Sequence, residues 1–301
     1  MRSMSDASSN KIIVTGATSI IGRFLLPRLL EAGYEVHAVS RKGSVNPDIT
    51  DNLSWHQADI DHPEQLPGVG ATALVHLAPL WLLPSLLPVL GSLGIKRVIA
   101  FGSTSLFSKA DSADAGERQL AARFAKVEET ISHDCGVSGI NWTVFRPTLV
   151  YDCARDKNIV QIARFIERYG FFPLLGSAEG HRQPVHADDL AQACIMALNQ
   201  PVTFNRSYNL SGGETLTYRQ MVEKIFGSLG RPKRFFIVPA WVFRWGIRVM
   251  MLLPGKRNIN PEMATRMNID LCFPHTDATK DFGFAPRPFS PAFVQQEQLR
   301  K

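Results

Sequence analysis

The sequence predicts an α/β protein built on a doubly wound parallel sheet of the Rossmann type, followed by a smaller lobe. Short apolar strands alternate with amphipathic helices over the first half of the 301 residues, the order that produces parallel sheets with right-handed crossovers. A glycine-containing loop follows the first strand and opens a helix, as in dinucleotide-binding folds. After about residue 150 the alternation weakens, which predicts the second lobe.

The chain divides into three expected parts. Residues 1–10 are polar and lack the apolar centre of a signal peptide, so we expect a disordered leader. Residues 11–150 are expected to form the dinucleotide-binding domain. Residues 151–301 are expected to form mostly the smaller substrate lobe, with some elements interleaved into the first sheet.

The elements of the first domain can be placed in order. Residues 11–15, KIIVT, are apolar and β-branched and predict the first strand. Apolar residues at helical spacing follow and stop at Gly33, and Pro27 should cost this helix one hydrogen bond and bend it. The other expected elements are strands at 35–41, 73–79, 96–103 and 141–147 and a helix over 113–133.

The second half contains fewer strong signals. Acidic residues mark the start of one expected helix, and Thr215 or Thr217 is a plausible N-cap for another. The expected elements are a helix within 158–176, a helix at 186–201, a strand at 207–213 and a helix at 215–230.

Two apolar stretches raise the question of a membrane span. Residues 77–95 carry no charge but contain three prolines and two glycines, and residues 240–254 are amphipathic with two arginines. A spanning helix needs about twenty predominantly apolar helical residues. Neither stretch meets that condition, so we expect both to pack inside the protein or between subunits.

Charge and cysteine content exclude several classes of function. The net charge of +6 is spread along the chain without a run of five basic residues, which favours a mildly basic phosphate-binding protein over a nucleic-acid-binding one. The four cysteines are widely spaced and form no CxxC pair. They predict reduced thiols in a cytoplasmic protein and no metal site.

The loop TGATSIIG, residues 15–22, has the context of a phosphate-binding turn because it links a strand to a helix. Gly16 permits the tight turn and Gly22 permits close packing of helix on sheet, while backbone amides at the helix start face a diphosphate. Ser19 stands where a glycine is usual. Its side chain crowds the diphosphate, but its hydroxyl can donate to it.

The end of the second expected strand indicates which dinucleotide binds. A carboxylate about twenty residues after the loop would accept hydrogen bonds from the ribose of NAD, but the strand ends with Ser40, Arg41 and Lys42. Positive charge and donors fit a 2′-phosphate. We therefore predict NADP in preference to NAD. Asp59 is a candidate acceptor for the adenine amino group.

Several segments in this order resemble the short-chain dehydrogenase/reductase superfamily, in the extended or atypical form called the NAD-dependent epimerase/dehydratase family. The likeness covers residues 11 to about 220 and rests on these segments: TGATSIIG, ADI, HLAP, FGSTS, AKVEE, WTVFRPTLVYD, RQPVHADDLA and YNLSGGETLTY. The tail DATKDFGFAPRPF also looks like the family's closing segment. The resemblance implies cofactor contacts from Gly16, Thr18, Ser19, Ile20, Ile21, Gly22, Ser40, Arg41, Lys42, Asp59, Ile60, Leu77, Ala78, Pro79, Lys126, Pro147 and Thr148.

The family's chemistry uses a Tyr, a Lys four residues later, and a Ser or Thr after the fifth strand. The resemblance assigns the hydroxyl role to Ser103 or Thr104 and the Lys role to Lys126, which would hold the nicotinamide ribose. Position 122, four residues before Lys126, is Ala122 and has no proton to give. Tyr151 is the candidate substitute acid. His76 is a second one, although a histidine inside a buried strand is more often structural.

Two functions remain open at this stage. The resemblance implies an oxidoreductase that moves hydride between NADP and a carbonyl or carbinol of a small molecule, with sugar nucleotides among the candidates. The alternative is a redox-silent NADP-binding regulator or assembly factor, because the acid at position 122 is missing. Neither function requires nucleic acid or a membrane span, and a homodimer is compatible with both.

Overall fold

The computed structural model describes residues 10–43, 52–239 and 266–293. The chain divides into two compact units, each assembled from three stretches. Unit 1 comprises Met1–Pro147, Ala187–Leu210 and Pro274–Ala285, and unit 2 comprises Thr148–His186, Ser211–Phe273 and Pro286–Lys301.

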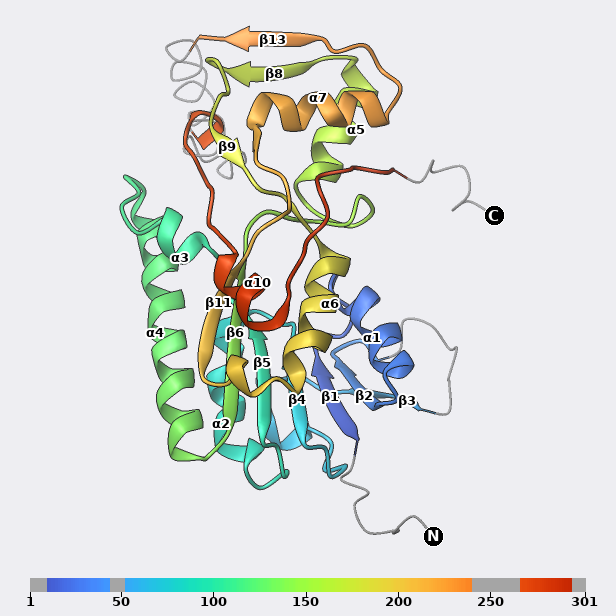
Figure 1. The fold of residues 1–301 in the computed structure, drawn as a ribbon, viewed down its shortest axis with the longest axis vertical. Helices are drawn as coiled ribbons and strands as arrows, with labels where there is room; N and C mark the ends of the chain where they lie inside the picture. Colours follow the sequence, from blue (N-terminus) through green and yellow to red (C-terminus); the bar gives the residue numbers. More distant parts are fainter. Residues whose placement is uncertain (1–9, 44–51, 240–265, 294–301) are drawn as a thin grey trace, which may run out of the picture. The chain divides into compact units, whose positions relative to one another are not determined.

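Unit 1 contains a seven-stranded sheet with every pairing parallel, in the order β11-β6-β5-β4-β1-β2-β3 (Figure 1). Its strands are β1 (Lys11–Thr15), β2 (Glu35–Ser40), β3 (Leu53–Gln57), β4 (Ala73–His76), β5 (Arg97–Phe101), β6 (Asn141–Pro147) and β11 (Arg206–Leu210). The order reverses between β1 and β4, which is the doubly wound arrangement. The predicted fold class is confirmed.

Helices cover both faces of the unit 1 sheet. Val98 and Ala100 of β5 belong to the core shared with α2 and α4, whereas Arg97 on the other face of β5 donates to carbonyls at the end of α6. The long helices are α1 (Gly22–Glu31), α2 (Leu83–Leu90), α4 (Ala115–Val137) and α6 (Ala187–Leu198). The short ones are η1 (Pro63–Gln65), η2 (Leu80–Leu82), α3 (Ser105–Ser108), η3 (Pro201–Thr203) and α10 (Thr276–Phe282).

The apolar stretch 77–95 lies inside unit 1. It forms η2 and α2, and its buried leucines face the sheet. They are Leu80, Leu83, Leu86, Leu87 and Leu90. The stretch therefore packs inside the protein, one of the two outcomes expected for it. Among the helices of the described residues, none is long and apolar enough to cross a membrane.

The described part of unit 2 is built from short two-stranded pairings with the helices α5 and α7. Its elements are β7 (Val150–Tyr151), α5 (Ile159–Tyr169), β8 (Phe172–Leu175), β9 (His181–Arg182), β10 (Val185–His186), β12 (Leu216–Thr217), α7 (Tyr218–Ser228), β13 (Phe235–Val238) and η4 (Arg266–Asn268). Strand β10 pairs with β7, β12 with β9, and β13 with β8. Thr217 is the N-cap of α7, with a capping box completed by Gln220. The segment 240–254 lies outside the described residues.

Candidate dinucleotide site

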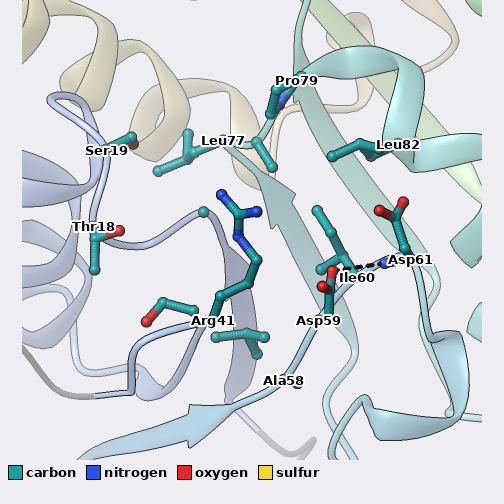
Figure 2. Close-up of a pocket in the computed structure, with 14 residues that line it drawn as sticks. Thr18, Ser19, Arg41, Ala58, Asp59, Ile60, Asp61, Leu77, Pro79 and Leu82 are labelled. Carbon is teal, nitrogen blue, oxygen red and sulfur yellow. Dashed lines mark hydrogen bonds between the residues drawn. The ribbon is translucent and has the colours of Figure 1, made fainter.

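A cavity of about 410 Å³ opens at the carboxyl ends of β1, β2, β3 and β4 (Figure 2). Open parallel sheets bind ligands at such an edge, where the strand order reverses. Four connections supply its walls: the turn after β1, the end of β2, and the loops after β3 and β4. The lining residues are Gly16, Thr18, Ser19, Val39, Ser40, Arg41, Ala58, Asp59, Ile60, Asp61, Leu77, Ala78, Pro79 and Leu82.

The turn after β1 accepts only glycine at its two ends. Gly16 has φ of +68°, and a Cβ there would lie 2.5 Å from the backbone nitrogen of Ala78. A Cβ on Gly22 would lie 2.1 Å from the carbonyl oxygen of Ala17. Both distances are far below van der Waals contact, so the glycines bring the loop backbone against its neighbours. The backbone at the start of α1 is thereby held at the edge of the cavity.

Ser19 takes part in the local structure of this turn. Its backbone amide donates to the carbonyl of Gly16 (2.9 Å), and its Oγ accepts a hydrogen bond from the amide of Gly22 (3.1 Å). The hydroxyl therefore satisfies one of the amides left without a partner at the start of a helix. The hydroxyl proton of Ser19 remains able to donate to a ligand at the cavity wall.

Arg41 is the one basic side chain among the residues that line the cavity. Figure 2 shows its side chain extended into the cavity, with Thr18 and Ser19 on one side and Asp59 on the other. Within the described part of the chain, no carboxylate lies within ion-pair distance of its guanidinium. A planar guanidinium in this position offers several donors to an anion.

The other two residues at the end of β2 have different positions. The Ser40 hydroxyl donates to the carbonyl of Gly43 (2.8 Å), which closes the turn that carries Arg41. Ser40 still lines the cavity. Lys42 is exposed and is not among the lining residues.

Asp59 organises the loop after β3. Its Oδ1 accepts from the amide of Asp61 (3.2 Å), and its own amide donates to the side chain of Gln65 (2.9 Å). A second hollow of about 350 Å³ adjoins the cavity through shared wall residues, and is lined by Arg41, Gln57, Ala58, Asp59 and Gln65. Carboxylate and amide oxygens there can accept from an amino group.

His76, at the end of β4, is fully buried. Its Nε2 lies 3.2 Å from the carbonyl oxygen of Pro79, which only accepts, so Nε2 carries the proton. Its Nδ1 then accepts from the Thr15 hydroxyl (2.9 Å). Burial lowers the pKa of His76 from 6.5 to about 4, so the ring is neutral at physiological pH. The ring links the end of β1 to the loop after β4 and is not among the residues that line the cavity.

The two candidate hydroxyls after β5 differ in their hydrogen bonds. Thr104 is buried and donates its hydroxyl proton to the carbonyl of Pro147 (3.1 Å). Ser103 is half-buried, and its Oγ accepts from the amide of Ser105 (3.1 Å). The Ser103 hydroxyl therefore retains a proton to donate to a substrate oxygen, whereas that of Thr104 is already used.

Lys126 lies on the exposed side of α4. Its ammonium pairs with Glu129 at 3.0 Å, and its side chain is 75% exposed. The buried face of α4 contains Phe124 and Glu128, and each is about 200° around the helix from Lys126 because successive residues turn by about 100°. Ala122 is exposed as well. The helix face with Ala122 and Lys126, which was expected to contact the ribose, is thus directed away from the sheet. Helix α4 contains no tyrosine.

Tyr151 is completely buried in the core of unit 2. Its ring contacts His186 and Phe289 edge to face, and its hydroxyl accepts from the amide of Ser290 (3.4 Å). This environment is that of a packed core residue, and it offers no support for the role of substitute acid.

Ten of the residues expected from sequence line the cavity, and several others do not. Seven expected residues are not among those that line the cavity: Ile20, Ile21, Gly22, Lys42, Lys126, Pro147 and Thr148. Four wall residues were not expected from the sequence: Val39, Ala58, Asp61 and Leu82. Asp61 stands two residues after Asp59 in the same loop, a signal that was present in the sequence.

The chemistry of this cavity fits a dinucleotide. It combines a glycine turn at a helix start, an arginine without a carboxylate partner in the described residues, and carboxylates in the loop after β3. Among the described residues, no group of three or more His, Cys, Asp or Glu side chains could hold a metal ion.

Comparisons with known proteins find similarity to an NAD-dependent family and to oxidoreductases. Residues 12–80 match the model of the NAD dependent epimerase/dehydratase family. The uncharacterized oxidoreductase YesF of Bacillus subtilis is 28% identical over 228 residues, which cover 74% of this chain and 72% of that protein. An NAD(P)H azoreductase of Xenophilus azovorans is 24% identical over 236 residues, covering 75% and 77%.

A solved structure extends the likeness in fold to almost the whole chain. The UDP-glucose 4-epimerase of Thermotoga maritima, determined with UDP-glucose, is similar with a TM-score of 0.69 at 18% identity. The match covers 92% of this chain and 93% of that chain. The likeness of the opening segment to the epimerase/dehydratase family and the likeness of the fold are therefore both confirmed.

Proposed function

Residues 12–80 match the model of the NAD-dependent epimerase/dehydratase family, and on that basis we propose that the unit 1 cavity binds NADP(H). The observation that carries the proposal is the end of β2, where Arg41 lines the cavity and no carboxylate stands in the Ser40–Gly43 turn. A ribose hydroxyl pair would lack a carboxylate acceptor at this turn, whereas a 2′-phosphate would find a guanidinium. The glycine turn at the start of α1 supports binding of the diphosphate.

The proposed activity is oxidation or reduction of a carbonyl or carbinol in a small molecule. When bound, the nicotinamide would supply or accept the hydride. Ser103 is the proposed hydroxyl that orients the substrate oxygen, because it keeps a proton to donate. His76 links the wall residue Pro79 to Thr15 and, with a pKa of about 4, carries no proton on Nδ1 to give.

The substrate class follows from the relatives and remains part of the proposal. A similar solved structure is named as an epimerase with UDP-glucose, which supports a sugar nucleotide. A relative named NAD(P)H azoreductase supports hydride delivery to another acceptor. Since α4 lacks a tyrosine, the proposed substrate is one whose reduction needs little help from an acid. The proposal includes a cytoplasmic location, where the four free cysteines stay reduced.

Steady-state turnover on a panel of carbonyl compounds, followed by consumption of NADPH, tests the activity. We expect Ser103→Ala to lower kcat by about 10-fold to 100-fold through loss of the hydrogen bond to the substrate oxygen. Thr104→Val and Tyr151→Phe should leave kcat within about twofold of the wild-type value, since both hydroxyls are buried and are not expected to contact a substrate. Equal losses in Ser103→Ala and Thr104→Val would contradict the assignment.

A redox-silent NADP-binding regulator is the second candidate function. The observation that favours it is α4, whose exposed Ala122 and outward Lys126 leave no acid–lysine pair on that helix. Tight NADPH binding without turnover on any member of the panel would support this function over the oxidoreductase.

A further inference from the structure

Unit 2 exposes apolar side chains along its outer strand. Phe236 and Ile237 of β13 are 62% and 55% exposed, and Tyr169 and Phe171, between α5 and β8, are 52% and 37% exposed. These four are half of the eight large hydrophobic side chains that the described residues expose. Their concentration in one unit distinguishes them from the scattered apolar residues that every protein surface carries.

The four side chains come from adjacent segments. The amide of Phe172 donates to the carbonyl of Arg234 (2.9 Å), and Phe235 pairs with Phe172 in register. The ring of Phe165 contacts Tyr169 at 4.6 Å and Phe171 at 5.8 Å between centroids. Among the described strands β13 pairs with β8 alone, and Figure 1 shows it as the outermost strand of unit 2.

Basic residues flank these apolar side chains along the chain. Arg168, Arg231, Lys233 and Arg234 are all exposed. Lys233 pairs with Glu223 at 3.0 Å, and Glu167 is the acidic neighbour of Arg168 on α5. No carboxylate of the described residues forms an ion pair with the other three basic residues. We call the β13 surface the set Tyr169, Phe171, Phe236, Ile237, Arg168, Arg231, Lys233 and Arg234.

The sequence around β13 has the same composition. Residues 224–261 contain eight Lys or Arg and not a single Asp or Glu. The chain as a whole carries 33 basic and 27 acidic residues, so this excess of positive charge is local. A basic segment that also exposes phenylalanine and isoleucine has the composition of an interfacial membrane-binding element.

We infer that the β13 surface docks onto the headgroup region of an anionic lipid bilayer. The aromatic and aliphatic side chains would enter the boundary between headgroups and acyl chains, while the arginines bind anionic headgroups. The chain would then lie on a membrane without crossing it. This inference goes beyond the proposed function, because none of the β13 surface residues lines the dinucleotide cavity.

A second copy of the chain is the competing occupant, because an exposed edge strand can pair with another strand. A two-fold contact through the β13 surface would bring the same basic residues of both copies together. Such like charges repel each other, whereas the negative charge of an anionic bilayer attracts them. Charge therefore favours the bilayer.

Sedimentation of the full chain with lipid vesicles tests the inference. We expect the protein to bind vesicles of phosphatidylcholine and phosphatidylserine and to stay in solution with phosphatidylcholine alone. Arg231→Gln with Arg234→Gln should weaken binding by about 25-fold, at about fivefold for each basic residue. Phe236→Ser with Ile237→Ser should weaken it by about tenfold or more. Rising salt should weaken binding of the wild-type protein.

Matched controls come from exposed residues of unit 1. Val137→Ser removes a side chain that is 78% exposed, and Lys280→Gln removes an exposed charge; both should bind vesicles as the wild type does. Circular dichroism and NADPH binding confirm that each variant is folded, which separates this test from that of the dinucleotide site. Equal binding to both vesicle types would overturn the inference, as would equal losses in the controls. A wild-type dimer that becomes a monomer in Phe236→Ser with Ile237→Ser, without vesicle binding, would assign the surface to a second copy instead.

Discussion

The buried imidazole of His76 makes folding sensitive to pH. Burial lowers its pKa from 6.5 to about 4, so between these values the unfolded chain binds a proton at this position that the folded chain does not. Because acid therefore favours the unfolded chain, the free energy of unfolding falls by about 3 kcal/mol as pH falls from about 6.5 to about 4. Urea unfolding of the wild type and His76→Gln over this range measures it.

The difference between the two pH profiles isolates His76, because burial also lowers the pKa of His37, His56 and His275. His76→Gln keeps a donor for Pro79 but cannot titrate. If the variant loses as much stability on acidification as the wild type does, the account of His76 is wrong.

At the scale of the element, α4 is held to the sheet by a buried ion pair. Glu128 is 8% exposed and accepts a bifurcated hydrogen bond from Arg146 Nε, at 3.0 Å to each carboxylate oxygen, with a further bond from Nη2. Removing the charge leaves the half-buried Arg146 without its anionic partner, so Glu128→Gln should lower the free energy of unfolding by about 3 kcal/mol. Thermal and urea unfolding measure the loss.

The adjacent glutamate is the matched control. Glu129 pairs with Lys126 at a similar separation, but both side chains are more than two-thirds exposed. Glu129→Gln should therefore cost about 1 kcal/mol or less. Similar losses for the two variants would show that burial does not decide the strength of these pairs.

The turn between β1 and α1 gives a second prediction at this scale. In Gly16→Ala the new methyl would collide with the backbone of Ala78, at a backbone conformation that only glycine adopts readily. We expect NADPH affinity to fall by at least about tenfold, measured by fluorescence titration. Gly70→Ala is the control for the conformational cost alone, because Gly70 also has positive φ but has no atom within 4 Å of the added Cβ. Equal NADPH affinity in Gly16→Ala and wild type would exclude the turn from the site.

At the scale of the whole molecule, ligand binding should stabilise one unit locally. The cavity draws its walls from four separate connections of unit 1, and a ligand that binds the folded state protects what it contacts. Hydrogen exchange of the full chain with NADPH should slow in peptides covering 15–22, 39–43, 58–61 and 77–82. Peptides of α5 and α7 in unit 2 should exchange at an unchanged rate. Protection confined to unit 2 would contradict the assignment.

Local patterns in the sequence predicted much of the unit 1 sheet. The strands at 11–15 and 141–147 match β1 and β6, and each of them contains four consecutive buried residues. Strand β3 was missed because only some of its side chains are partly buried. Helix α2 was missed because it contains Pro84 and Pro88, which usually end helices.

The site was less predictable than the fold. The turn residues and Arg41 follow a strand directly, so their place at the cavity could be inferred from the chain order. The direction of Lys126 could not, because four-residue spacing puts two residues on one helix face without saying which face meets the sheet. Leu82 was hidden in a leucine-rich run, and only the fold of the loop after β4 brings it to the wall.

Titration calorimetry with NADPH and NADH tests the central claim most directly. The wild type should bind NADPH more tightly than NADH, and Arg41→Ala should weaken NADPH binding by about 10-fold to 100-fold while changing NADH binding by less than about threefold. Lys126→Gln, which removes an exposed cation outside the cavity, should leave both affinities unchanged. Equal losses for the two dinucleotides in Arg41→Ala, or no binding of either by the wild type, would contradict the account.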